Sequence, residues 1–229
     1  IALIYLAVGF CEKCFMVQLL EQPEESKMFH ENYAFYSSTS IYMEKHFQNL
    51  ANKLMQFHGS NKNLFVVEIG CNDGILLNQF KLNNVDCLGI EPSKNVALVA
   101  RKRGLNVLIS FFNDKIATKI LKEKKKADVI VSANVMCHIP YINTIFSGIK
   151  KLLDKDGIFV FEDPYLGEII KKNSFDQIYD EHAFYFSALS IDYVTKLHDL
   201  RLIDVEKLNT HGGSMRYYVC HREKKNISP

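Results

Sequence analysis

The sequence predicts an α/β protein with a doubly wound, mostly parallel sheet and a small N-terminal appendage. From Leu64 onward, short apolar runs alternate with stretches of helical spacing. The apolar runs lack the in-out alternation of a half-exposed sheet, which is typical of parallel strands covered by helices on both faces. A chain that repeats strand and helix in this way winds into one sheet through right-handed crossovers.

The elements follow one another in a regular order. Strands are predicted over residues 64–70, 85–91, 106–109, 127–133 and 157–162, and helices over 74–82, 94–103, 115–122 and 141–153. An irregular aromatic stretch runs from 164 to 186. A helix over 188–198 and strands over 202–208 and 214–220 complete the pattern.

The first 60 residues have a different character. They hold an apolar run over residues 1–10 that we interpret as a strand, a Cys-x-x-Cys, an aromatic loop over 33–36, and an amphipathic helical stretch over 41–57. We therefore predict an appendage over residues 1–60 and a cofactor-binding α/β domain over residues 61–229.

Composition restricts the class of partner. The chain has 229 residues, of which 48% are hydrophobic, and its formal net charge is only +2. A chain without a basic excess is a poor ligand for a phosphate backbone, so we expect a small-molecule substrate and no nucleic acid. The apolar opening is too short to cross a bilayer, and the scattered cysteines fit a reducing, cytoplasmic compartment.

A glycine-bounded turn follows the first predicted strand of the domain, and it contains Glu68, Gly70, Asn72, Asp73 and Gly74. Glycine at both ends lets the backbone pass close to a ligand, and ligands of open α/β sheets lie at the carboxyl ends of the strands. The next strand ends about 20 residues later at Glu91, followed by Pro92, where a carboxylate can accept hydrogen bonds from ribose hydroxyls. The pair predicts a nucleoside-containing cofactor.

The charge of this turn narrows the choice of cofactor. A dinucleotide usually needs the spacing G-x-G-x-x-G for its pyrophosphate, whereas Gly70 and Gly74 are four residues apart. Carboxylates at the entrance repel a pyrophosphate and attract the sulfonium and ammonium groups of S-adenosylmethionine. We therefore predict S-adenosylmethionine. The alternatives are a nicotinamide-dependent oxidoreductase on the same fold and a glycine turn that binds no ligand.

Two further groups of residues are candidates for the site. Asn134 and His138 follow the fourth strand of the domain, so they should reach the reaction centre unless His138 merely packs, and Phe112 borders either the adenine or the core. Tyr179, Glu181 and His182 place a phenol, a carboxylate and an imidazole within four residues. Such a trio can perform acid-base chemistry, although a lone Glu-His pair is more often structural.

The chain resembles the sugar C-methyltransferases, which use S-adenosylmethionine to methylate carbon on nucleotide-linked keto-deoxysugars. The resemblance runs through nearly the whole chain. It is carried by Cys11-x-x-Cys14 with Val17-Gln18-Leu19, the segment 33–40, Glu68-x-Gly70-x-Asn72-Asp73-Gly74, Asn134 with His138, Tyr179-x-Glu181-His182, and His211-Gly212-Gly213-Ser214-Met215-Arg216.

The resemblance implies a Rossmann-like class I methyltransferase fold and a role for each matching residue. His182 would be the base with Tyr179 and Glu181 beside it, and His138 and a tyrosine of the appendage would line the pocket. Of Tyr33 and Tyr36, we favour Tyr36 as the catalytic tyrosine and place Tyr33 at the substrate. The alternatives for His211 and Arg216 are a contact with substrate and a simple hairpin before the last strand.

Two departures from the family pattern affect these expectations. The family carries two Cys-x-x-Cys pairs that share one zinc, so Cys11 and Cys14 form half a site, and zinc requires a second pair. Family members also continue past the segment around Arg216, so we expect a chain truncated at its C-terminus relative to the family. A cofactor-binding remnant without catalytic activity is therefore the alternative to an active enzyme.

Overall fold

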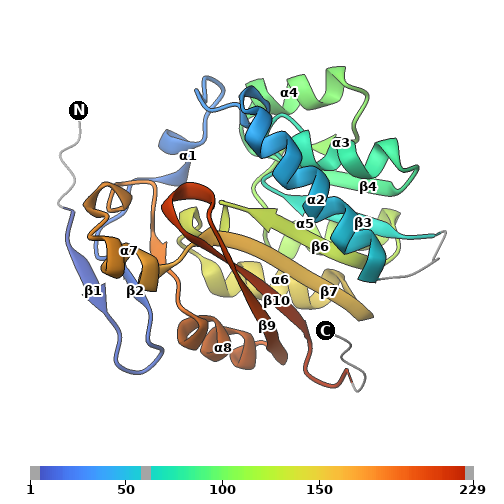
Figure 1. The fold of residues 1–229 in the computed structure, drawn as a ribbon. Helices are drawn as coiled ribbons and strands as arrows, with labels where there is room; N and C mark the ends of the chain where they lie inside the picture. Colours follow the sequence, from blue (N-terminus) through green and yellow to red (C-terminus); the bar gives the residue numbers. More distant parts are fainter. Residues whose placement is uncertain (1–5, 58–62, 225–229) are drawn as a thin grey trace.

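The computed structural model describes residues 6–57 and 63–224, and it places one seven-stranded sheet at the centre of the molecule (Figure 1). The strand order is β5 (Val107–Leu108), β4 (Asp86–Ile90), β3 (Phe65–Ile69), β6 (Ala127–Ala133), β7 (Leu153–Pro164), β10 (Ser214–His221) and β9 (Leu200–Leu208). The first five strands are parallel, whereas β10 runs antiparallel to both of its neighbours. This topology confirms the predicted doubly wound, mostly parallel sheet.

Helices cover both faces of the sheet. On one face α2 (Ile41–Phe57), α3 (Ile75–Leu82) and α4 (Lys94–Lys102) share a buried apolar cluster with the strands. On the other face α5 (Asp114–Glu123), α6 (Ile142–Leu152) and α8 (Ala188–Leu197) do the same. The central strand β3 is buried along its whole length, which explains why its sequence is a continuous apolar run interrupted only by Glu68.

Local signals in the sequence fix where several helices begin. The Asn113 side chain accepts a hydrogen bond from the backbone N–H of Ile116 and so caps α5. Ser187 and Ser190 form a capping box at the start of α8. These caps satisfy backbone N–H groups that would otherwise lack partners at the first turn.

Helix α2 lies within the predicted appendage, yet it packs against the sheet. Phe47, Leu50 and Leu54 are buried in the same cluster as Val66 of β3 and Phe80 of α3. The sheet core therefore extends to residues on the N-terminal side of residue 60. The division of the chain at that residue stays a prediction.

A second, small sheet was not expected from the sequence. Strands β1 (Val8–Phe10) and β2 (Val17–Leu19) form a hairpin, and β8 (Phe184–Tyr185) pairs with β2 from the stretch predicted to be irregular. That stretch also contains the helix α7 (Leu166–Lys172). The strand expected over residues 1–10 is confined to Val8–Phe10 among the described residues, and residues 1–5 lie outside them.

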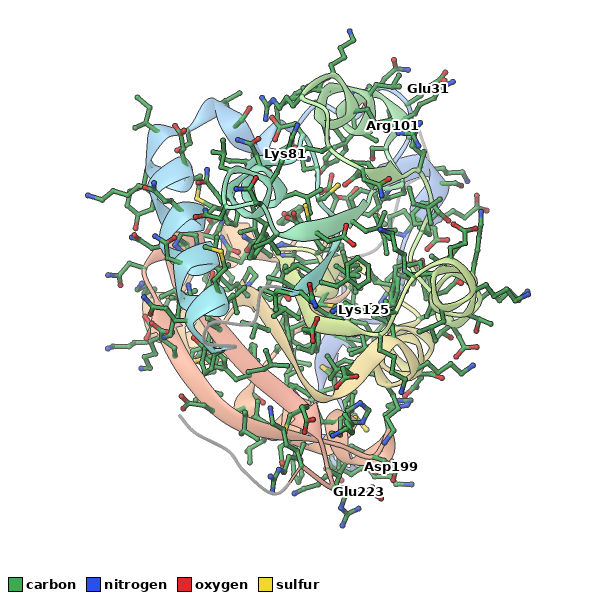
Figure 2. The ribbon with its side chains drawn as sticks, turned by 90° about the vertical axis from the view of Figure 1, so that its right-hand side faces the viewer. Glu31, Lys81, Arg101, Lys125, Asp199 and Glu223 are labelled. Carbon is green, nitrogen blue, oxygen red and sulfur yellow. The ribbon has the colours of Figure 1, made fainter. Side chains whose placement is uncertain are left out.

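Strand β7 is also longer than predicted. It begins at Leu153, directly after α6, because Leu153 pairs with Ala127 before the register shifts at the start of β6. Exposed charged side chains such as Glu31, Asp199 and Glu223 lie at the periphery of the molecule (Figure 2). Within the described residues, no helix is both long and apolar enough to span a membrane.

The free energy of unfolding of two variants tests whether α2 packs into the core. Leu54 has no exposed surface, whereas Ile41 on the same helix is 86% exposed. We expect Leu54→Ala to lower the free energy of unfolding by about 3 kcal/mol, because it leaves a cavity in the core. The control Ile41→Ala should change it by less than about 0.5 kcal/mol. Equal effects in urea denaturation would show that α2 is not part of the core.

Candidate active site

The turn between β3 and α3 needs both of its glycines. Gly70 has φ +71° and Gly74 has φ +83°, a region that side chains with a Cβ rarely adopt. A Cβ on Gly70 would lie 2.3 Å from Cγ2 of Val135, and one on Gly74 would lie 2.3 Å from Cδ1 of Leu105. The turn can therefore sit close to the end of β6 and to α4 only because these positions lack side chains.

Glu91 at the end of β4 fixes this turn. One carboxylate oxygen accepts a hydrogen bond from the backbone N–H of Asn72 at 2.9 Å, and the other accepts one from the N–H of Ser93 at 2.8 Å. Burial raises the pKa of Glu91, and these two N–H donors oppose that rise. The carboxylate thus joins the ends of two neighbouring strands.

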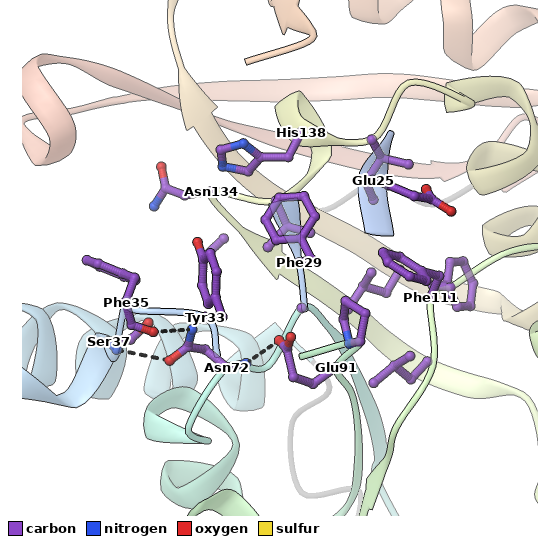
Figure 3. Close-up of a pocket in the computed structure, with 18 of the residues that line it drawn as sticks. Glu25, Phe29, Tyr33, Phe35, Ser37, Asn72, Glu91, Phe111, Asn134 and His138 are labelled. Carbon is purple, nitrogen blue, oxygen red and sulfur yellow. Dashed lines mark hydrogen bonds between the residues drawn. The ribbon is translucent and has the colours of Figure 1, made fainter. Parts of the chain in front are cut away.

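A cavity lies where β3, β4 and β6 end (Figure 3). Six of the residues predicted to hold the cofactor line it: Gly70, Asn72, Glu91, Pro92, Phe112 and Asn134. Apolar side chains that include Ile90 and Phe111 form part of the wall. The side-chain oxygen of Asn134 is buried and has no hydrogen-bond partner within the described residues.

The other three predicted cofactor residues lie elsewhere. Glu68 is buried beneath the turn, where burial and then the charge of Glu91 raise its pKa well above the ordinary value, and neither it nor Gly74 lines the cavity. Asp73 is also absent from the cavity wall. Its carboxylate accepts hydrogen bonds from the backbone N–H and the hydroxyl of Ser38, and Arg103 lies 3.7 Å from it. These contacts hold the Asp73 carboxylate against Ser38 and Arg103.

Asp73 instead helps to hold residues 29–38, which we call the cover segment. The Asn72 side chain adds two bonds, accepting from the N–H of Ser37 at 3.0 Å and donating to the carbonyl of Phe35 at 3.1 Å. Phe29, Tyr33 and Phe35 of the cover segment line the cavity (Figure 3). Phe29 and Phe35 were not among the site residues predicted from the sequence. The only sequence signal for them is their aromatic composition.

A second cavity adjoins the first. The two share Tyr33, Phe35, Asn134, His138 and His211 as lining residues. The second cavity is also lined by Tyr179, Glu181 and His182, the trio predicted to perform acid-base chemistry. The structure therefore places these three residues in a cavity next to the one that the β3–α3 turn lines, and His138 and Asn134 belong to the walls of both.

Two hydrogen bonds determine which ring nitrogen of His182 carries the proton. Its Nδ1 lies 2.8 Å from the carbonyl oxygen of Gln177, and its Nε2 lies 3.0 Å from the Tyr179 hydroxyl. Because a carbonyl can only accept, Nδ1 carries the proton and Nε2 accepts from Tyr179. Burial lowers the pKa of His182, so Nε2 is unprotonated at neutral pH. Burial raises the pKa of Tyr179, which keeps its hydroxyl proton.

His138 is held in the same way. Its Nδ1 lies 2.8 Å from the carbonyl oxygen of Glu181, and its ring centre is 5.0 Å from that of His182. Burial, and then the neighbouring His182, lower the pKa of His138 to about 4. At neutral pH the N–H group at Nδ1 therefore donates to the backbone carbonyl of Glu181, and the unprotonated Nε2 can only accept a hydrogen bond. His138 lines both cavities, as expected of a residue near the reaction centre.

The two candidate tyrosines are in different places. Tyr33, expected at the substrate, lines both cavities. Tyr36, favoured as the catalytic tyrosine, lines neither, and its hydroxyl accepts a hydrogen bond from the Asn95 side chain at 3.1 Å. The spacing of three residues left the sequence unable to distinguish them, because the backbone path of the cover segment decides which ring turns inward.

His211 and Arg216, both expected near the substrate, also lie in different places. His211 lies in the turn before β10 and lines both cavities. Arg216 lines neither, because its guanidinium is buried in the sheet and donates to Glu162 at 2.6 Å and to Glu206 at 2.7 Å. Arg216 therefore links β7, β10 and β9 and does not extend towards either cavity.

The Cys-x-x-Cys lies in the hairpin between β1 and β2. Cys11 is exposed and Cys14 is half-buried, and backbone N–H groups, first that of Cys14, lower the pKa of the Cys11 thiol. Within residues 6–57 and 63–224, no third cysteine, histidine or carboxylate completes a metal-ligand group with them. A structural zinc site takes four ligands, so these two residues do not suffice for zinc.

Comparison with known proteins establishes the family. A family model described as a methyltransferase domain matches residues 42–205. The chain belongs to this methyltransferase-domain family. The match confirms the prediction of a methyltransferase domain.

Two curated proteins are similar in sequence. C-methyltransferase NovU from Streptomyces niveus is 32% identical over 215 residues, which cover 94% of this chain and 51% of NovU. A ubiquinone biosynthesis O-methyltransferase from Pelagibacter ubique is 26% identical over 149 residues, which cover 65% of this chain and 61% of that protein. The chain spans about half the length of NovU.

Solved structures share the fold at low identity. Magnesium protoporphyrin IX methyltransferase from Synechocystis, with bound S-adenosylhomocysteine, has a TM-score of 0.60 and 12% identity, covering 80% of this chain and 88% of its own. The PH0226 protein from Pyrococcus horikoshii has a TM-score of 0.63 and 16% identity, covering 82% and 94%. These likenesses confirm the Rossmann-like class I fold.

The residues of the first cavity fit S-adenosylmethionine. Glu91 would accept hydrogen bonds from the ribose hydroxyls, and Ile90, Phe111 and Phe112 offer apolar surface for the adenine. The unpartnered amide oxygen of Asn134 is suited to the ammonium group of the methionine part. The cavity thus offers acceptors for the cofactor's hydroxyls and positive charge.

Glu91→Gln tests this assignment. The substitution removes the negative charge and replaces one acceptor oxygen by an NH₂ that faces backbone donors. We expect S-adenosylhomocysteine to bind about 10- to 100-fold more weakly in calorimetry, because hydrogen bonds to charged groups contribute about 1.5–3 kcal/mol. The control Glu123→Gln changes an exposed carboxylate at the end of α5. Equal affinity in wild type and Glu91→Gln would contradict the assignment.

Proposed function

We propose that this chain carries the methyl-transferring part of a C-methyltransferase that acts on a nucleotide-linked keto-deoxysugar. His182 is the base in this proposal, with Tyr179 and Glu181 beside it, and Tyr33 and His211 contact the substrate. The proposal rests on one observation above all. An unprotonated ring nitrogen, oriented by a backbone carbonyl, lies in a cavity that adjoins the cofactor cavity.

Methylation of a carbon next to a ketone needs a base. A hydrogen next to a ketone is weakly acidic, so a base must remove it before the carbon becomes a nucleophile. When bound, S-adenosylmethionine supplies a methyl group on a positively charged sulfur. His182 would take the proton on Nε2, and the C–H electron pair would form the enolate. The enolate carbon would then bond to the methyl carbon while the bond between that carbon and sulfur breaks, and the neutral thioether S-adenosylhomocysteine would leave.

Tyr179 has two tasks in this sequence. In the structure its hydroxyl donates to Nε2 of His182. When a substrate approaches, the hydroxyl would rotate and donate to the developing enolate oxygen, which frees Nε2 for the proton. Because burial raises the pKa of Tyr179, the phenol remains a hydrogen-bond donor throughout. Tyr33, whose pKa is raised by burial and then by Glu181, offers a second hydroxyl to the same cavity.

The substrate class rests on sequence similarity and on the lining of the second cavity. NovU is named a C-methyltransferase, and the sequence motifs resemble those of enzymes that act on nucleotide-linked sugars. Polar side chains of Lys27, His30 and Asn32 line the second cavity together with His211. Such a lining is suited to a hydroxylated, phosphorylated substrate. The family match does not support the nicotinamide-dependent alternative.

Replacement of the base is the direct test. We expect His182→Gln to lower kcat for methyl transfer to a keto-deoxysugar nucleotide by about 10²- to 10⁴-fold, the usual contribution of a general base. Binding of S-adenosylhomocysteine should persist. The control His198→Gln replaces a half-exposed histidine that stacks on Phe146, outside both cavities.

Two outcomes would contradict the proposal. Normal turnover by His182→Gln would show that another group takes the proton. Methyl transfer by wild type that is undetectable on every keto-sugar nucleotide tested, with the donor bound, would favour the non-catalytic alternative.

The pH profile gives an independent check. A base acts when it is unprotonated, and burial moves the pKa of His182 below its ordinary value of 6.5. We therefore expect kcat/KM to fall on the acid side with a midpoint below pH 6.5. A profile that loses half of its activity above pH 7 would contradict the assignment of His182.

A further inference from the structure

Three potential metal ligands converge beside the proposed base. Cys137 and His138 are neighbours in the turn η2 (Met136–His138) after β6, and His182 reaches them from the segment before β8. The Cys137 sulfur and one ring nitrogen of each histidine all lie within 4.8 Å of one another. All three side chains are buried. Two segments that are distant in sequence thus bring one thiol and two imidazole rings close together.

The second hydrogen bonds of the histidines match those of metal ligands. Each Nδ1 donates to a backbone carbonyl, that of Glu181 for His138 and that of Gln177 for His182. Histidines that bind metals almost always donate their other ring N–H to a carbonyl or carboxylate in this way. Both Nε2 atoms therefore carry lone pairs that can bind a cation without loss of a proton.

Carboxyl groups also lie close to these three residues. Asp163 lies beside the Cys137 thiol, and its carboxylate accepts a hydrogen bond from the Cys137 backbone N–H at 3.3 Å. Its second oxygen is buried without a hydrogen-bond partner in the part of the chain that the structure describes. Asp180 and Glu181 line the second cavity, through which a cation would enter.

The required adjustment is small. A tetrahedral zinc ion with bonds of about 2.0–2.3 Å holds its ligand atoms about 3.3–3.8 Å apart. The three ligand atoms lie within 4.8 Å of one another, so they would have to approach by about 1 Å to bind one ion. The Tyr179 hydroxyl, which now donates to His182, would turn aside as it does for a substrate.

We propose that Cys137, His138 and His182 bind one thiophilic divalent cation such as Zn²⁺, with the fourth position open to the second cavity. Cys137 binds as the thiolate, and its proton is released to solvent. Because His182 Nε2 is one of the ligands, the cation blocks the base. The site is then inhibitory, and this consequence rests on the proposed function.

Cobalt(II) titration of the full chain tests the site without turnover. A Cys11→Ser/Cys14→Ser background removes the exposed thiol pair, which would otherwise bind the probe. We expect one equivalent of Co²⁺ to produce a thiolate-to-cobalt charge-transfer absorption, since a cysteine ligand is required for that band. No such band in the folded background would overturn the proposal.

Single variants in that background identify the ligands. Cys137→Ser should abolish the charge-transfer band, and His182→Gln, which keeps the thiol, should weaken Co²⁺ binding at least about tenfold. The control Cys220→Ser replaces another buried cysteine, on β10, and should leave binding unchanged. Thermal melts establish that each variant is folded. Unchanged bands in both ligand variants would overturn the proposal.

Inhibition is measured separately. Zn²⁺ should inhibit methyl transfer in competition with the sugar nucleotide and not with S-adenosylmethionine, and a chelator should reverse the effect. Cobalt binding by a protein that transfers no methyl groups even after a chelator has removed the metal would contradict the proposed function and leave the metal site intact. Methyl transfer that Zn²⁺ does not affect, in a protein without the cobalt band, would overturn the metal site and leave the function intact.

Discussion

The proposed chemistry of this molecule depends on the hydrogen bond from Nδ1 of His182 to the carbonyl oxygen of Gln177. That bond fixes the tautomer, so the unprotonated nitrogen is the one beside Tyr179. The carbonyl belongs to the short turn η3 (Phe175–Gln177), and the two partners are only five residues apart. The orientation of the His182 ring, the proposed base, is thus a local property that is set by backbone geometry and not by a neighbouring carboxylate.

The position of this segment around His182 in the fold depends on contacts with residues that are distant in sequence. Strand β8 begins two residues after His182 and pairs with β2, and the backbone N–H of Leu19 donates to the carbonyl of Ala183 at 3.0 Å. The small sheet therefore ties the acid-base trio to the N-terminal segment. From the other side, His138 ties it to the end of β6. The cover segment, held by Asn72 and Asp73, then closes the first cavity over the cofactor turn.

The sequence predicted the large sheet because both faces of its parallel strands are buried, which leaves continuous apolar runs. It also located Gly70, Asn72 and Glu91, since the strand ends of an α/β sheet share one edge. It could not predict the role of Asp73, which depends on Ser38 arriving from a distant segment. The same holds for Arg216, whose buried ion pairs with Glu162 and Glu206 form only when three strands are assembled. Strand β8 was missed because two residues carry no periodic pattern.

Exchange of the substrate's carbon-bound proton with D₂O measures the action of the base most directly. With S-adenosylhomocysteine in place of the methyl donor, no methyl group can be transferred, and proton removal is observed alone. A keto-deoxysugar nucleotide followed by NMR should lose the signal of the hydrogen next to its ketone with wild type and keep it with His182→Gln. Equal exchange by both proteins, or none by a wild type that transfers methyl groups, would contradict the account.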